Sequence, residues 1–351
     1  MHIQEKKKNN QEKERFFVLA IELLADFPER VQNIFKQRFG LSGSFLPQTL
    51  DEIGEENNVT RERIRQIIAD NKKQISKKYE TDKLKKEESA IIFVIENNCG
   101  IIKESDIFLS LNLKESTKEV SALKFLVGFS RKISVVLEKG FLEKSWISSI
   151  ETLGRAKKII IETEKILREK NRTLSSDEIH QSLVSIFPDL SKKAMLSYLG
   201  SSFRIKSNQF EKWGLRNWPE ISPKGSREKI YLILKEVGKP LHFLQIVKLI
   251  DRYKLGEKKT HPQTIHNELI KDARFILIGR GIYALSEWGY HKGTVRDVIV
   301  DILQKKERSM SREEITQAVL DVRKVKEDTI AINLKDKNFF KKDKQLFYSL
   351  K

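Results

Sequence analysis

Five side chains that can hydrogen-bond to nucleic acid fall within residues 61–66 of this 351-residue sequence. They are Arg61, Glu62, Arg63, Arg65 and Gln66. Guanidinium, carboxylate and amide groups pair with the edges of bases in a DNA major groove, and guanidinium groups also bind phosphates. The chemistry that this segment favours is therefore recognition of DNA by an exposed helix.

Two short helices joined by a turn are predicted to position these groups. Thr49 and Glu52 have the spacing of a capping box, which begins a first helix. Gly54 lies where two helices can approach closely, and the asparagines at 57–58 turn the chain. Residues 47–67 therefore have the complete pattern of a helix-turn-helix.

The second helix of this pattern is amphipathic. Thr60 caps it, and Ile64 and Ile67 face inward while the five polar groups face outward. A helix that buries one thin apolar stripe fits a DNA major groove. The alternative is an ordinary charged surface helix.

Residues 15–75 resemble region 4 of the primary bacterial sigma factors. The resemblance is most specific at VTRERIRQI, residues 59–67, and it includes the segment 28–41, which in that family is a helix that packs across the helix-turn-helix. The resemblance implies that Arg61, Glu62 and Gln66 read bases of a promoter −35 element. By that analogy Arg61 approaches a guanine edge, Glu62 accepts from a cytosine amino group, and Gln66 faces a mixed donor and acceptor edge.

The neighbouring polar residues are better suited to the DNA backbone. Thr60, Arg63 and Arg65 are predicted to contact phosphates, which positions the helix without reading sequence. Lys72 and Lys73 continue the same helix and are predicted to run beside DNA.

The chain departs from complete sigma factors in what precedes this motif. A full sigma factor carries upstream regions that bind core polymerase and melt the −10 element. Here about fifteen residues, the charged tail MHIQEKKKNNQEKER, come first. We therefore expect a protein that is not a complete sigma factor.

The composition indicates a polyanionic partner. The formal net charge is +18, and 39% hydrophobic residues suffice for buried cores. Nucleic acid is the usual partner of such a chain and a membrane surface is its rival, but no run has the length of a transmembrane helix. The single Cys99 excludes an intramolecular disulfide. With no signal peptide at the N-terminus, we expect a cytoplasmic protein with no membrane partner.

Residues 84–351 show an internal repeat. Ile107, Ile179, Ile246 and Ile315 are separated by 72, 67 and 69 residues, each within a second helix that follows a polar cap. Every unit has three helical segments and a short strand pair. The expected fold is therefore mainly α with small β-hairpin wings, in which an N-terminal helix-turn-helix domain precedes four tandem winged-helix units.

This repeat predicts the domain boundaries. They are a charged tail at 1–14, a region 4-like domain at 15–83, and winged-helix units at 84–149, 150–221, 222–290 and 291–351.

The third winged unit resembles a second known family, the HARE-type winged helix. The residues that carry it are REKIYLILKEVGKPLHFLQIVKLI and RFILIGRGIYALSEWGY, within 226–290. That module occurs in the delta subunit of Gram-positive RNA polymerase, in chromatin-associated proteins, and fused to restriction enzymes. The resemblance implies a process linked to DNA or to polymerase.

Several residues of the repeats allow two interpretations. Trp146, Trp218 and Trp288 end three units, where they are either core anchors or platforms for bases. Arg280, between Gly279 and Gly281 at a predicted wing tip, either contacts a phosphate or the minor groove or is a solvated turn residue. A lysine cluster flanks Phe339 and Phe340 and is either a phosphate site or a solvated surface: Lys335, Lys337, Lys341, Lys342 and Lys344.

The sequence contains no pattern typical of catalysis or of cofactor binding. It lacks a GxxxxGK[ST] phosphate loop, a GxGxxG turn and an HExxH zinc helix. His261 and His266 are five residues apart, on different faces of a helix, which disfavours a shared metal. We predict no catalytic residues, no metal site, no cofactor and no small-molecule substrate.

The sequence thus predicts a DNA-binding transcription factor. Its region 4-like domain would read a −35-like element in double-stranded DNA, and core RNA polymerase is a candidate partner. The alternative is an interaction module, similar to the delta subunit, that binds RNA polymerase or other proteins without reading DNA sequence. A DNA-processing enzyme is the third and least supported interpretation.

Overall fold

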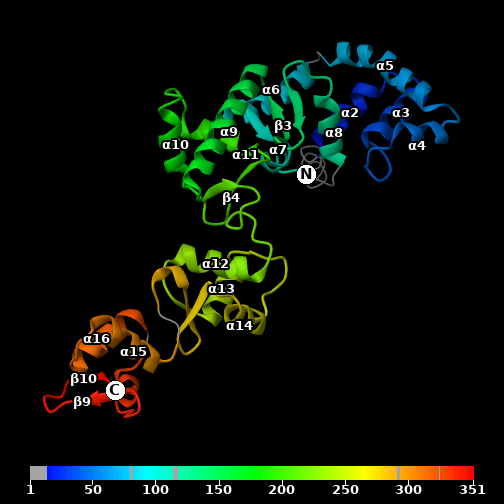
Figure 1. The fold of residues 1–351 in the computed structure, drawn as a ribbon. Helices are drawn as coiled ribbons and strands as arrows, with labels where there is room; N and C mark the ends of the chain where they lie inside the picture. The colour runs from blue at the N-terminus through cyan, green and yellow to red at the C-terminus, as the bar shows by residue number, and fades with distance from the viewer. Residues whose placement is uncertain (1–13, 80–81, 114–117, 291–292, 324) are drawn as a thin grey trace, which may run out of the picture. The chain divides into compact units, whose positions relative to one another are not determined.

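The computed structural model describes residues 14–79, 82–113, 118–290, 293–323 and 325–351. The charged tail expected at 1–14 lies outside these residues except for Glu14. The chain folds into two compact units, Met1–Lys206 and Ser207–Lys351, and both consist mainly of helices with small antiparallel sheets (Figure 1).

The described part of the first unit begins with four helices that include the helix-turn-helix. They are α2 (Arg15–Leu24), α3 (Glu29–Phe39), α4 (Leu50–Glu56) and α5 (Arg61–Lys78). Helix α3 starts directly after Pro28 and ends at Gly40, whose φ of +65° is a left-handed C-cap. Glu29 in the first turn and Lys36 and Arg38 in the last turn complement the helix dipole.

A three-helix segment with a three-stranded sheet follows. Its elements are α6 (Asp82–Asn97), β1 (Ile101–Lys103), α7 (Glu104–Ser110), α8 (Lys118–Val127), β2 (Ser134–Glu138) and β3 (Leu142–Ile147). The strand order is β1-β3-β2, all antiparallel, and Ile102 of β1 lies opposite Trp146 of β3.

Three further helices and a strand pair come next in the chain. They are α9 (Ile150–Lys170), α10 (Ser176–Val184), α11 (Lys192–Gly200), β4 (Ile205–Ser207) and β5 (Trp213–Leu215). Each helix begins at a serine whose side chain accepts a backbone N–H of the first turn: Ser149, Ser175 and Ser191.

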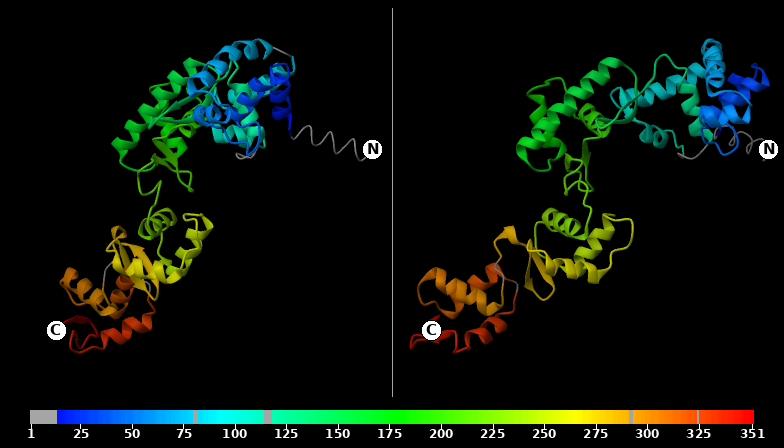
Figure 2. Two further views of the ribbon diagram at one scale, coloured as in Figure 1. Left: turned by 90° about the vertical axis from the view of Figure 1, so that its right-hand side faces the viewer. Right: turned by 45° about the vertical axis from the view of Figure 1, so that its right-hand side comes forward.

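The second unit holds two more such segments. The first comprises α12 (Ser226–Val237), β6 (Leu241–His242), α13 (Phe243–Arg252), α14 (Pro262–Lys271), β7 (Phe275–Gly279), β8 (Ile282–Leu285) and the 3₁₀ turn η1 (Ser286–Trp288). The next comprises α15 (Val295–Lys306), α16 (Arg312–Val322), α17 (Glu327–Leu334), β9 (Phe340–Lys342) and β10 (Tyr348–Leu350). Figure 2 shows these segments from two further sides.

The same order of three helices and an antiparallel strand pair therefore occurs four times. The isoleucines that define the sequence repeat, Ile107, Ile179, Ile246 and Ile315, are all fully buried. The extra strands β1 and β6, which pair with β3 and β8, are absent from the expected pattern. They are short and lie directly against the next helix, so their own sequence carries too little alternation to predict them.

The tryptophans that end three segments belong to the packing of their segments. Trp146 is completely buried, and its Nε1–H donates to Glu104 Oε2 at 3.0 Å. Trp218 and Trp288 are half-buried, and Trp288 packs against the core of its segment. Their positions favour core anchors over platforms for bases.

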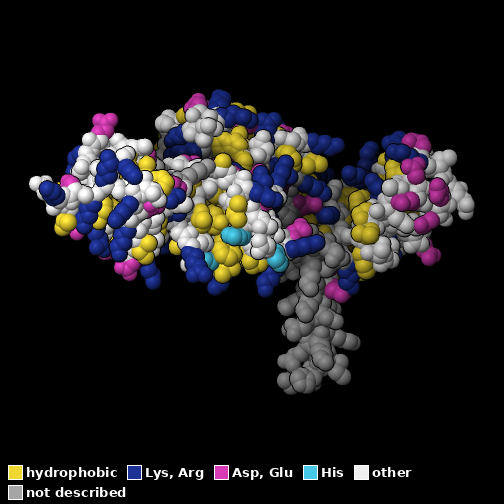
Figure 3. All heavy atoms as spheres, turned by 60° about the horizontal axis from the view of Figure 1, so that its bottom comes forward, with side chains coloured by type: hydrophobic (Ala, Val, Ile, Leu, Met, Phe, Trp, Pro, Cys, Tyr) yellow, Lys and Arg dark blue, Asp and Glu magenta, His cyan; other side chains and the backbone are white. Residues whose placement is uncertain are grey.

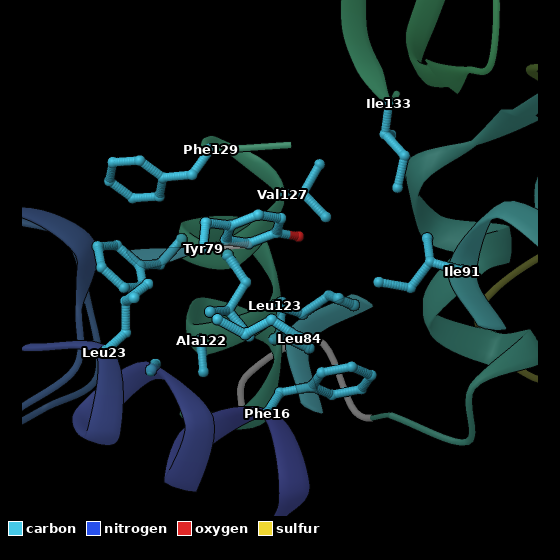
Figure 4. Packing of buried hydrophobic residues seen from close by; sticks show 14 of the residues in the cluster. Phe16, Leu23, Tyr79, Leu84, Ile91, Ala122, Leu123, Val127, Phe129 and Ile133 are labelled. Carbon is cyan, nitrogen blue, oxygen red and sulfur yellow. The ribbon is translucent and has the colours of Figure 1, made fainter. Parts of the chain in front are cut away.

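One hydrophobic core joins α2, α3 and α5 to the segment that follows. It runs from Phe16 on α2 to Trp146 on β3, and α8 lies against both α2 and α3 (Figures 1 and 4). Phe125 of α8 contacts Phe39 of α3 edge-on, with ring centroids 5.0 Å apart. The helix-turn-helix is therefore not an independently packed head.

A buried carboxylate strengthens this junction. Glu119 of α8 is 5% exposed and accepts the backbone N–H groups of Phe16 at 3.0 Å and Phe17 at 2.8 Å. These N–H groups belong to the first turn of α2 and have no partner within that helix. Burial raises the pKa of Glu119, while the two N–H bonds oppose that shift.

Candidate nucleic-acid interface

The capping box predicted for the first helix of the helix-turn-helix is present. Thr49 N–H donates to Glu52 Oε2 at 2.6 Å, and Glu52 N–H donates to Thr49 Oγ1 at 3.2 Å. These bonds begin α4 at Leu50, and the hydrogen bonds that the Thr49 N–H and hydroxyl donate to the Glu52 carboxylate lower the pKa of Glu52. The start of α4 is thus defined by its own residues.

The turn between α4 and α5 brings backbone against backbone. A Cβ atom on Gly54 would lie 2.7 Å from the carbonyl oxygen of Val59, so a larger residue would force the turn to move. Asn58 adopts a φ of +54°, and Val59 N–H donates to the Gly54 oxygen at 2.9 Å. The close approach predicted at Gly54 is therefore to the turn itself.

A small separate cluster fixes α5 against its neighbours. Ile34 of α3, Ile53 of α4 and Ile64 of α5 are each fully buried and contact one another. Thr60 caps α5 by accepting Arg63 N–H at 3.3 Å. One isoleucine from each helix therefore sets the direction in which α5 presents its opposite face.

The outward face of α5 carries the predicted contact residues. Arg61, Glu62, Arg63, Arg65, Gln66, Lys72 and Lys73 are all exposed, as is Thr60 at the cap. At 100° per residue, Glu62, Gln66 and Lys73 lie on one line along the helix, opposite Ile64. The 18-residue helix is about 27 Å long, so the two lysines lie well beyond its N-terminal groups.

Arg61 has an acidic neighbour that the sequence did not indicate. Its Nη1 lies 3.3 Å from Asp51 Oδ2 on α4, and both side chains are more than 60% exposed. Such an exposed pair is weak. It orients the guanidinium without preventing exchange for another acceptor.

Glu62 and Arg65 form a bidentate pair along the helix. Arg65 Nε donates to Glu62 Oε2 at 2.8 Å, and Nη2 donates to Oε1 at 2.6 Å. The hydrogen bonds from Arg65 lower the pKa of Glu62, so its carboxylate stays ionised where an ordinary glutamate begins to protonate. An ionised Glu62 can only accept, which is what a cytosine amino group requires.

The remaining outward residues differ in their contacts. Arg63 Nη1 lies 3.4 Å from Gln66 Oε1, and hydrogen bonding from the Gln66 side chain also helps to lower the pKa of Glu62. Lys72 and Lys73 extend into solvent further along α5. Amide and lysine groups are thus both presented, the amide near the turn and the lysines toward the other end.

A polar network between α3 and the two ends of α4 was not predicted from the sequence. Gln48 Nε2 donates to Glu56 Oε1 at 2.8 Å, Gln37 contacts the same carboxylate, and Arg38 Nη1 donates to the Gln48 carbonyl at 2.8 Å. These bonds hold α3 against the start and the end of α4. No local pattern predicts them, because their partners lie up to 19 residues apart.

Helix α4 makes the charge of this domain uneven. It carries Asp51, Glu52, Glu55 and Glu56, all exposed, beside the basic face of α5. Acidic side chains gather on the right-hand lobe in Figure 3, which holds these helices. Phosphates are therefore expected to meet α5 rather than α4.

Arg280 belongs to the other unit and lies in the turn that joins β7 to β8. The turn is exposed, and Gly281 adopts a φ of +69° with no room for a Cβ atom beside His242. Arg280 thus lies at the tip of the β7–β8 hairpin.

The described residues offer neither a metal site nor a membrane-spanning helix. In those ranges, no three or more His, Cys, Asp or Glu side chains gather in a way that could hold a metal ion. None of the described helices is long and apolar enough to cross a membrane.

Two family comparisons agree with this geometry. Residues 23–71 match the family model of sigma-70 region 4, and residues 227–288 match that of HARE-HTH, a helix-turn-helix domain named in part after ASXL and restriction endonuclease. The first match contains α3, α4 and most of α5, and the second extends from α12 to η1. Both families are DNA-binding helix-turn-helix domains, so two segments of the chain are similar to domains of DNA-binding types.

Proposed function

We propose that this protein is a transcription factor that reads a −35-like promoter element through α5. The observation that carries the proposal is the exposure of Arg61, Glu62 and Gln66 in the first two turns of a helix whose inward face is fixed by Ile64, within residues that match sigma-70 region 4. N-terminal residues of a recognition helix are the ones that reach base edges. In this proposal Thr60, Arg63, Arg65, Lys72 and Lys73 contact phosphates.

Base reading predicts a loss of specificity when Arg61 or Gln66 is truncated. Arg61→Ala and Gln66→Ala are each expected to weaken binding to a −35-containing duplex about 5- to 150-fold, equivalent to about 1–3 kcal/mol. Binding to a scrambled duplex should change much less. Fluorescence anisotropy with both duplexes, at one fixed salt concentration, measures the ratio.

Arg63→Ala is the matched control for this experiment. It removes a guanidinium two positions from Arg61 that is assigned to a phosphate. Binding to both duplexes should therefore weaken by the same factor. Equal affinity of the wild-type chain for the two duplexes, unaffected by Arg61→Ala or Gln66→Ala, would refute base reading.

We further propose that the four repeated segments are winged-helix units that extend the contact with DNA or polymerase. Their recurring element order supports this, and Arg280 is the phosphate contact proposed for the third wing. Docking on RNA polymerase would use surfaces other than the apolar side of α2 and α3 that α8 covers.

A pull-down of core polymerase in the presence of nuclease separates this proposal from the alternative. A protein-interaction module would retain polymerase without DNA. A chain that is linked to polymerase only because both bind the same DNA duplex would no longer retain polymerase after nuclease treatment.

A further inference from the structure

The hairpin formed by β9 and β10 ends in a rigid, exposed tip. Asp343 N–H donates to the Phe347 oxygen at 3.0 Å, and Leu346 N–H donates to the Asp343 oxygen at 3.2 Å. The carboxylate of Asp343 also accepts the N–H groups of Gln345 and Phe347, each at 2.9 Å. These four bonds fix the backbone of residues 343–347 in one conformation.

Leu346 is an unusual residue for its place in this turn. Its φ of +69° is left-handed, a conformation that bulky residues rarely adopt. The turns of the other three hairpins also contain a left-handed residue: Gly140, Glu211 and Gly281. Two of these are glycine and one is charged, so only the β9–β10 hairpin has an apolar side chain at this position.

The β4–β5 hairpin gives a direct comparison. Asn208 there makes the same four kinds of bond that Asp343 makes, and Glu211 occupies the position of Leu346. A polar residue is therefore compatible with this turn. The leucine is not required by the backbone, and it contributes little to the core because its side chain is 63% exposed.

Cations lie on the same hairpin as this exposed leucine. Lys341, Lys342 and Lys344 are all exposed on the hairpin, and Lys342 Nζ lies 5.4 Å from the centre of the Tyr348 ring. Asp343, the acidic residue of this tip, accepts the two backbone N–H groups at its Oδ1 atom. Lys and Arg are prominent on the left-hand lobe in Figure 3, which holds this segment.

We propose that this hairpin enters the minor groove of double-stranded DNA and inserts Leu346 between two base pairs. An apolar side chain that is held outward on a rigid tip can act as a wedge, and flanking lysines can bind the phosphates on either side. The inference rests on the proposal that the chain binds DNA. It does not require that α5 reads a −35 element.

A base-stacking probe tests the wedge in the full chain. The duplex carries 2-aminopurine at a TA step and contains no −35-like sequence, because pyrimidine–purine steps unstack most easily. Wild-type protein is expected to increase the fluorescence at saturation. Leu346→Gly should remove most of that increase while changing affinity by less than about threefold, since the lysines remain.

Glu211→Gly is the matched control. It makes the same backbone change in the equivalent turn and should leave the fluorescence increase intact. Leu346→Asn, which tolerates a left-handed φ, should behave like Leu346→Gly and thereby exclude an effect of backbone freedom alone. An unchanged fluorescence increase in Leu346→Gly, or no increase with wild-type protein at saturation, would overturn the wedge.

The lysines require a separate measurement. Replacing Lys341, Lys342 and Lys344 by Gln should lower the slope of log affinity against log salt by up to about 2.7, at roughly 0.9 per phosphate contact. An unchanged slope would contradict the proposed approach to the groove. Binding to phosphatidylserine vesicles that depends on Leu346, without any unstacking of DNA, would assign the hairpin to a membrane surface and overturn the proposal.

Failure of −35 reading is distinguishable from failure of the wedge. The Arg61→Ala variant should lose sequence preference yet still unstack the probe duplex. Leu346→Gly should keep sequence preference and lose unstacking.

Discussion

Raising monovalent salt from about 50 mM to about 200 mM is expected to weaken DNA binding at least about 500-fold. Five of the proposed phosphate contacts are cationic side chains of α5 and of the β7–β8 turn: Arg63, Arg65, Lys72, Lys73 and Arg280. At roughly 0.9 per contact they contribute about 4.5 to the slope of log affinity against log salt, and the lysines of the β9–β10 hairpin would add up to about 2.7. The ion pair between Arg65 and Glu62 hinders phosphate binding by Arg65 only slightly, because both side chains are about 60% exposed and water screens their attraction. Anisotropy titrations at several salt concentrations measure the slope.

The double variant Lys72→Gln, Lys73→Gln should reduce that slope by about 1.8. Its matched control is Lys158→Gln, Lys193→Gln, which removes two exposed lysines from α9 and α11 and should leave the slope almost unchanged. A wild-type slope near zero would contradict phosphate binding and favour the protein-interaction alternative. A slope that the two double variants lower equally would contradict the placement of phosphates along α5.

The parts of the fold that the sequence predicted are those that local physics determines. The capping box of Thr49 and Glu52 involves residues three apart, so its pattern is visible without any tertiary information. The buried isoleucines of the repeat follow from helical periodicity in the same way. Both features depend only on residues that are close together in the sequence.

The junction between the helix-turn-helix and the next segment could not be predicted in this way. Glu119 binds the N–H groups of Phe16 and Phe17 across more than 100 residues. In the sequence it is one more glutamate on an amphipathic helix, where a solvated position is the usual outcome. Only the packed structure distinguishes this buried carboxylate from its exposed neighbours.

The sequence predicted which residue types form the candidate site, but not which of these side chains contact one another or their neighbours. The outward direction of Arg61, Glu62 and Gln66 followed from the inward isoleucines. The contact between Arg61 and Asp51 depends on how α4 crosses α5, which periodicity does not specify. The wedge residue Leu346 likewise looked like an ordinary apolar residue of a strand, because its left-handed φ arises from a turn closed by Asp343.

The shared core makes a strong prediction about Phe125. This residue is fully buried on α8, and its ring centroid lies 5.0 Å from Phe39 and 6.4 Å from Phe35 of α3. Phe125→Ala is expected to destabilise the first unit by about 3–5 kcal/mol. Because these rings join α3 to α8, amide hydrogen exchange should quicken in both helices together.

The consequence for function follows from the position of α3. Ile34 of α3 belongs to the cluster that fixes α5, so loosening α3 should lower the temperature at which sequence-specific DNA binding is lost. Phe275→Ala is the matched control: it removes a buried phenylalanine from the core around α12, α13 and α14 in the other unit. It should destabilise that segment and leave exchange in α3 and α8 unchanged. If Phe125→Ala instead quickened exchange in α8 alone, the helix-turn-helix would be an independent head, and the two segments would not share a cooperative core.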